Sequence, residues 1–131
     1  GGTLVDLPYR RGVYPRPSWS PDGRRLAFSE HLDDGRWADL FVADADGRTP
    51  PSPVFQSPEH EWEVAWSPDG ATLALWTVRG DRYGLYTARP DGSGLTLRHE
   101  GSGVLGFRWS PDGTRLLFRA PSGVGDESVL I

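Results

Sequence analysis

The residues of this sequence best suited to chemistry are its histidines and the acidic residues beside them. Glu59, His60 and Glu61 are adjacent, and their carboxylate and imidazole groups could hold a metal ion. His60 lies six residues before the next WSPDG tryptophan, whereas His99 lies ten before its own. Because equivalent ligands of one ring would keep one spacing, the pattern favours solvated loop residues. We therefore expect no metal and no cofactor.

A second set of carboxylates, Asp22, Asp69 and Asp112, occurs each time in the pentapeptide WSPDG. Three such groups could be catalytic or could bind a cation. However, Pro suits position i+1 of a type I turn, Asp suits i+2, and Gly adopts the left-handed conformation that closes a hairpin. We expect no catalytic residue and interpret these residues as structural turns: Ser20, Pro21, Asp22, Gly23, Ser67, Pro68, Asp69, Gly70, Ser110, Pro111, Asp112 and Gly113.

The composition excludes several classes of function. The 131 residues carry a net charge of −4, and the 14 basic residues are scattered, which argues against nucleic-acid or anionic-membrane partners. No apolar run reaches the ~18 residues typical of a membrane span. Without cysteine there is no thiol nucleophile and no disulfide. All basic residues are arginine, which indicates a GC-rich and bacterial source, and the Gly1–Gly2 start indicates a processed or truncated end.

The three pentapeptides mark the same point of a longer repeat. "SWSPDGRRLAF", "AWSPDGATLAL" and "RWSPDGTRLLF" align without gaps, and their tryptophans are 47 and 43 residues apart. Repeats of this length are typical of β-propeller blades with four antiparallel strands. Short alternating runs, and no sustained helical period, predict an all-β chain with three blades.

Each repeat divides into strands a to d, and the whole chain is expected to form one half-propeller domain, 1–131. The expected blades are 13–56, 61–99 and 104–131, and the last lacks strand d. The expected strands are 13–20, 25–30, 39–44 and 51–56, then 61–67, 72–78, 83–89 and 94–99, then 104–110, 114–119 and 127–131. Residues 1–8 match a strand d and precede the first blade as an orphan.

The WSPDG motif, its "LAF" strand and the later "DLFVADADG" run resemble the repeats of TolB-like propellers. The resemblance covers nearly the whole chain. It implies a six-bladed ring that serves as a protein-interaction scaffold without catalytic residues, and it favours a periplasmic or extracellular location. Similar blades precede the catalytic domain of prolyl-oligopeptidase-like peptidases. Nothing in the sequence resembles the Gly-x-Ser-x-Gly element of such hydrolases.

Three blades are too few for a ring, which usually contains four to eight. The orphan strand of one copy could complete the third blade of another, and two copies would then form a six-bladed homodimer. Such a dimer would also cover unpaired strand edges. The alternative is that the sequence is half of a longer six-bladed chain.

A partner is expected to bind the face opposite the WSPDG turns, where loops vary on a rigid frame, or the mouth of the central channel. The loops of that face are 9–14, 31–38, 57–62, 79–83, 99–104 and 121–127. The candidate binding residues are Tyr14, Arg16, Trp37, His60, Glu61, Trp62, Glu63 and Arg108. Ion pairs at the channel wall are the competing interpretation of the charged ones. Besides a scaffold, two functions stay open: a ligand- or metal-binding or hydrolase-type propeller, and the gating propeller of a peptidase.

Overall fold

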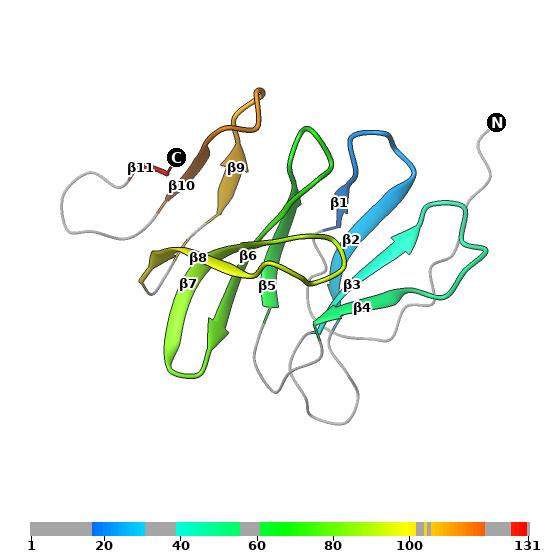
Figure 1. Cartoon of the computed structure of the whole chain (residues 1–131), viewed down its shortest axis with the longest axis horizontal. Coiled ribbons are helices and arrows are strands. Elements are labelled where there is room, and N and C mark those ends of the chain that lie inside the picture. The colour runs from blue at the N-terminus through cyan, green and yellow to red at the C-terminus, as the bar shows by residue number, and fades with distance from the viewer. Residues whose placement is uncertain are drawn as a thin grey trace.

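The computed structural model describes residues 17–30, 39–55, 61–101, 104, 106–119 and 127–130. Within these ranges the chain is all-β, and eleven strands form three antiparallel sheets that stand side by side (Figure 1). In this part of the chain there is no helix of the length and apolar character needed to cross a membrane. The fold class expected from the sequence is confirmed.

The first sheet, blade 1, contains β1 (Ser18–Trp19), β2 (Arg25–Glu30), β3 (Asp39–Asp44) and β4 (Ser52–Phe55) in that spatial order. The pairing of β2 with β3 runs without interruption from Arg25 opposite Asp44 to Glu30 opposite Asp39. Because successive side chains of a strand point to opposite faces, the unbroken apolar runs "LAF" and "LFV" supply apolar groups to both faces of the blade.

Blade 2 contains β5 (Glu61–Trp66), β6 (Leu73–Arg79), β7 (Arg82–Ala88) and β8 (Thr96–Glu100), again in sequence order. β6 is buried from Leu73 to Val78 without alternation, because each face of the blade packs on a neighbouring sheet. β8, the outer strand, alternates between exposed and partly buried residues.

Blade 3 contains β9 (Phe107–Trp109), β10 (Leu116–Arg119) and β11 (Glu127–Leu130). The strand expected over 104–110 is shorter than predicted and begins at Phe107, because Gly106 has a φ of 129° and leaves the extended conformation. The predicted strands 25–30 and 39–44 match β2 and β3, and the other described boundaries differ by at most three residues. The predicted strand 1–8 and residues 13–16 of the next one lie outside the described residues.

Two apolar clusters hold the three blades together. The first contains Ala27 and Leu40 of blade 1 with Leu73, Leu75 and Tyr86 of blade 2. The second contains residues of blades 2 and 3: Ala74, Trp76, Leu85, Phe107, Leu116 and Phe118. The inner strands β1, β5 and β9 contact one another in succession, so the blades fan out from them. The core therefore lies between the sheets, and every junction is built from equivalent positions of the repeat.

The three WSPDG turns lie at one end of the sheets, the upper edge in Figure 1. The β6–β7 turn lies at the opposite end. Since strands alternate in direction, the connections β3–β4 and β7–β8 share the end of the WSPDG turns. We call this end the turn face.

Candidate functional site

Each WSPDG turn is closed by one repeated set of hydrogen bonds. In the first, Gly23 N–H donates to the Ser20 carbonyl over 2.9 Å, and Gly23 has a φ of 69°. The Ser20 hydroxyl donates to Asp22 Oδ1 over 2.6 Å and accepts from Arg25 N–H over 2.9 Å. The same bonds recur around Ser67 and Ser110. The aspartates thus serve their own turns.

These bonds lower the pKa values of the turn aspartates. The Ser110 hydroxyl, followed by the backbone N–H and hydroxyl of Thr114, lowers the pKa of Asp112 to about 2. The pKa values of Asp22 and Asp69 are lowered in the same way, first by the hydroxyls of Ser20 and Ser67. Carboxylates held ionised by their own turns do not have the raised pKa that a general acid needs near neutral pH.

The tryptophans before the second and third turns, Trp66 and Trp109, pack on the preceding blade. The ring of Trp66 lies under the guanidinium of Arg25 in blade 1, with 4.7 Å between the guanidinium carbon and the ring centroid. Its backbone N–H donates to Ser18 Oγ over 3.0 Å. In the next junction, Trp109 Nε1 donates to the Ala65 carbonyl of blade 2 over 3.2 Å. These contacts join each blade to its neighbour at the turn face.

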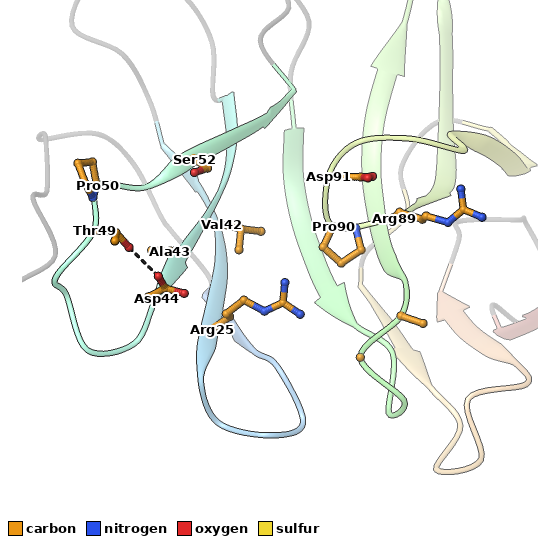
Figure 2. A pocket seen from close by; sticks show the side chains of 12 residues that line it. Arg25, Val42, Ala43, Asp44, Thr49, Pro50, Ser52, Arg89, Pro90 and Asp91 are labelled. Carbon is orange, nitrogen blue, oxygen red and sulfur yellow. Dashed lines mark hydrogen bonds between the residues drawn. The ribbon is translucent and has the colours of Figure 1, made fainter.

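A groove of about 570 Å³ opens on the turn face between blades 1 and 2, and Figure 2 shows its lining residues. Arg25 and Val42 point from blade 1 toward Pro90 of blade 2. The lining combines aliphatic and proline groups with side chains of both charges. The residues are Arg25, Val42, Ala43, Asp44, Thr49, Pro50, Ser52, Gly70, Ala71, Arg89, Pro90 and Asp91.

The polar groups of the groove are held by local hydrogen bonds. Thr49 Oγ1 donates to Asp44 Oδ2 over 2.6 Å, which is the bond drawn in Figure 2. Asp91 Oδ1 accepts from both the N–H and the hydroxyl of Ser93. The Ser93 hydroxyl, followed by its N–H, lowers the pKa of Asp91. A lining that mixes aliphatic and proline groups with charged side chains suits an extended peptide better than a reacting small molecule.

A second, smaller groove of about 250 Å³ lies between blades 2 and 3. Its residues Thr72, Thr87 and Gly113 occupy the repeat positions of Arg25, Val42 and Gly70 in the first groove. The site is therefore a feature of every described junction, but only the first has arginines on both of its sides.

Of the sequence-predicted binding residues, the structure describes the side chains of Glu63 and Arg108. Glu63, on β5, lies beside the start of blade 3, since a Cβ on Gly106 would be 3.8 Å from its Oε2. Arg108, on the neighbouring β9, is exposed, and its Nη1 donates to the Phe107 carbonyl over 3.1 Å. Tyr14, Arg16, Trp37 and His60 lie outside the described residues, and for Glu61 and Trp62 only their place in β5 is described. The proposed binding set stays a prediction.

His99, predicted as the last residue of the strand 94–99 and the first of the loop 99–104, lies within β8. Its ring is 4.5 Å from that of Phe118 in blade 3, so it helps to pack a junction. Within the described ranges, no three His, Asp or Glu side chains are grouped as metal ligands. Sequence reasoning also missed the groove, because its residues come from five separate stretches of the chain that only the blade packing brings together.

Solved β-propellers have the same fold as this chain. A putative TolB from Agrobacterium tumefaciens superposes with a TM-score of 0.72 and 19% identity, over 88% of this chain and 42% of that one. TolB from Acinetobacter baumannii gives 0.68 and 16%, over 87% and 30%. The β-propeller domain of the Trilobed protease from Pyrococcus furiosus, described as having an open velcro topology, gives 0.62 and 13%, over 86% and 38%.

These likenesses show a TolB-like β-propeller fold. The chain spans less than half the length of each of these proteins. No protein-family model matches the sequence, and no curated protein sequence is significantly similar to it.

Proposed function

We propose that this chain is a non-catalytic scaffold that binds an extended segment of a protein partner, and that two copies form its working unit, a six-bladed ring. The observation that carries the proposal is the groove between blades 1 and 2. Its aliphatic and proline groups offer contact area, and its two arginines, Arg25 and Arg89, can orient a polar chain through their charge. The turn carboxylates of the described part are engaged in hydrogen bonds, which leaves them a structural role.

Arg89 offers the sharpest test of the groove. It is exposed at the groove rim, at the end of β7, and Arg82 is exposed at the start of the same strand, on the opposite face. Arg89→Glu and Arg82→Glu therefore introduce the same charge reversal at opposite ends of β7, and only Arg89 lies at the groove. The probe is an array of short peptides that tiles the proteins of the source organism.

The wild-type chain is expected to bind a subset of these peptides. Arg89→Glu should weaken that binding by at least about tenfold, a change of ~1.4 kcal/mol, and Arg82→Glu should leave it unchanged. If Arg82→Glu or Arg108→Glu weakens binding and Arg89→Glu does not, the groove is wrong and the partner binds the opposite loop face or the channel mouth, the two places predicted from the sequence. If no peptide binds, the peptide-binding scaffold is wrong.

A ligand- or metal-binding propeller is the first alternative. Calorimetric titration with calcium and with zinc separates it from the scaffold, because tight stoichiometric binding of either ion would overturn the proposal. If the chain hydrolyses a bound peptide, the proposal that the scaffold is non-catalytic is wrong.

The likeness to the propeller domain of the Trilobed protease favours a second candidate, a propeller that controls access to a peptidase. In that case the gene would continue into a hydrolase domain, and sequencing the gene on both sides of this segment decides the matter. In that case, peptide binding by the Arg89→Glu and Arg82→Glu variants would be measured in the longer protein.

A further inference from the structure

The exposed apolar residues of the two end blades occupy positions that the inner junctions bury. Trp19 is 58% exposed, whereas Trp66, at the same position of the next repeat, is 6% exposed. At the other end, Leu117 is 43% exposed, whereas its counterparts Ala27 and Ala74 are fully buried. These differences in exposure do not come from different positions in the repeat, because the repeats align without gaps. It arises because Trp66, Ala27 and Ala74 each face a neighbouring blade of the same chain.

The turns repeat the same asymmetry. A Cβ on Gly70 would lie 3.5 Å from Pro21 Cδ, and one on Gly113 would lie 3.4 Å from Pro68 Cδ. The proline of each turn thus lies against the glycine of the next turn. For Gly23, no atom of the described residues lies within 4 Å of the same position, and Pro111 is exposed. Blade 1 therefore presents the glycine of this contact, Gly23, and blade 3 presents the proline, Pro111.

Arg25, which covers a tryptophan of the next blade, has an equivalent in blade 3, Arg115. Arg25 stands six residues after Trp19 and covers Trp66 of the next blade. Arg115 stands six residues after Trp109 and is exposed. We call Trp19 and Gly23 the leading edge of blade 1, and Pro111, Arg115 and Leu117 the trailing edge of blade 3.

We infer that the leading edge of one copy docks on the trailing edge of a second copy, with Arg115 over the ring of Trp19, Leu117 facing its blade and Pro111 against Gly23. This inference rests on the proposed two-copy ring and names its contacts. The occupant is a second copy because the chain carries both halves of one junction: the proline–glycine contact occurs at both internal junctions, and the arginine–tryptophan contact occurs at the first. In a twofold dimer the contact occurs twice, each time with the roles of the two copies exchanged.

The contact is confined to the turn end of the blade face. Leu26, Phe28 and Ala43, which lie deeper on the face of blade 1, are already buried within one copy. The affinity between the two copies therefore comes from the turn end of blade 1, where Trp19 is exposed. A buried tryptophan with an arginine on its face is the kind of contact that dominates interface energies.

The test uses single substitutions with matched controls. Trp19→Ala and Leu117→Asp remove the two sides of the contact, and both residues are exposed in one copy, so each variant should keep its fold by far-UV circular dichroism. Tyr83→Ala and Leu95→Asp make comparable changes at exposed apolar residues of blade 2 and should leave assembly unchanged. The measurement is the dimer dissociation constant from sedimentation equilibrium.

The wild type is expected to dimerise, and each edge variant should raise the dissociation constant by at least about 100-fold. A mixture of the Trp19→Ala and Leu117→Asp chains should recover dimers, because Trp19 of one chain then meets Leu117 of the other in one intact junction. A contact between like residues, Trp19 with Trp19, would give no such recovery.

The outcomes separate the two proposals. A wild-type chain that stays monomeric overturns the two-copy ring and with it this contact. A wild-type dimer that persists in both edge variants overturns the contact alone, as does a failure of the mixed chains to recover dimers.

Discussion

The guanidinium of Arg25 in blade 1 lies over the indole ring of Trp66 in blade 2, 4.7 Å from its centroid. The pair joins two blades at the floor of the groove, since Arg25 also lines that groove. A cation over a tryptophan ring is stabilising because the ring face is electron-rich, and partial burial strengthens the attraction. One arginine therefore links the stability of the junction with the shape of the candidate site.

Replacing Arg25 by Ala should lower the free energy of unfolding by about 1–2 kcal/mol, because the cation and its apolar stem both leave the face of Trp66. Arg24→Ala is the matched control, since Arg24 is exposed and should cost less than about 0.5 kcal/mol. Urea unfolding curves give both values. Equal losses in the two variants would show that the stacking contributes nothing measurable.

The sequence predicted those parts of the fold that are local. The WSPDG turns and the strands β2 and β3 were predictable because Pro, Asp and Gly set the turn and because short apolar runs bounded by turns indicate strands buried on both faces. The difference between Trp19 and Trp66 was not predictable from their own repeats, because it depends on whether another blade lies against the ring. The groove and the packing of His99 on Phe118 were missed for the same reason.

Gly92 provides a second test of the junction between blades 1 and 2. Gly92 and Gly94 both have a positive φ, 85° and 68°, so alanine is strained at either position. A Cβ on Gly92 would also lie 2.5 Å from the Val54 carbonyl oxygen of blade 1, whereas near Gly94 it would meet only the end of the Arg89 side chain, at 3.8 Å. The β7–β8 turn is thus packed against β4 at one glycine and open at the other.

Gly94→Ala should therefore cost about 1 kcal/mol, from backbone strain alone, and Gly92→Ala should cost about 2–4 kcal/mol, because the two blades must also move apart. Chemical denaturation of the two variants under the same conditions measures the difference. Equal costs would show that the approach of the turn to Val54 is absent in solution.

The carboxylate of Asp112 makes stability depend on pH. Its pKa is lowered from 3.8 to about 2, first by the Ser110 hydroxyl and then by the N–H and hydroxyl of Thr114. Between these pH values the unfolded chain binds more protons than the folded chain, so the free energy of unfolding falls as the pH falls. Asp22, Asp69 and Asp91 have pKa values lowered by equivalent bonds and act in the same direction.

Asp112→Asn isolates this effect, because the amide keeps an oxygen that can accept the same hydrogen bonds but has no charge. Above about pH 5 the wild type should be more stable than the variant, since the ionised carboxylate is present and strengthens the bonds. The difference should shrink as the pH falls through 4 and 3, and should vanish only below pH 2, where the folded-state carboxyl is protonated. Urea unfolding of both proteins across this range measures it. A difference that is the same at pH 7 and at pH 2 would mean that the charge of Asp112 does not stabilise its turn.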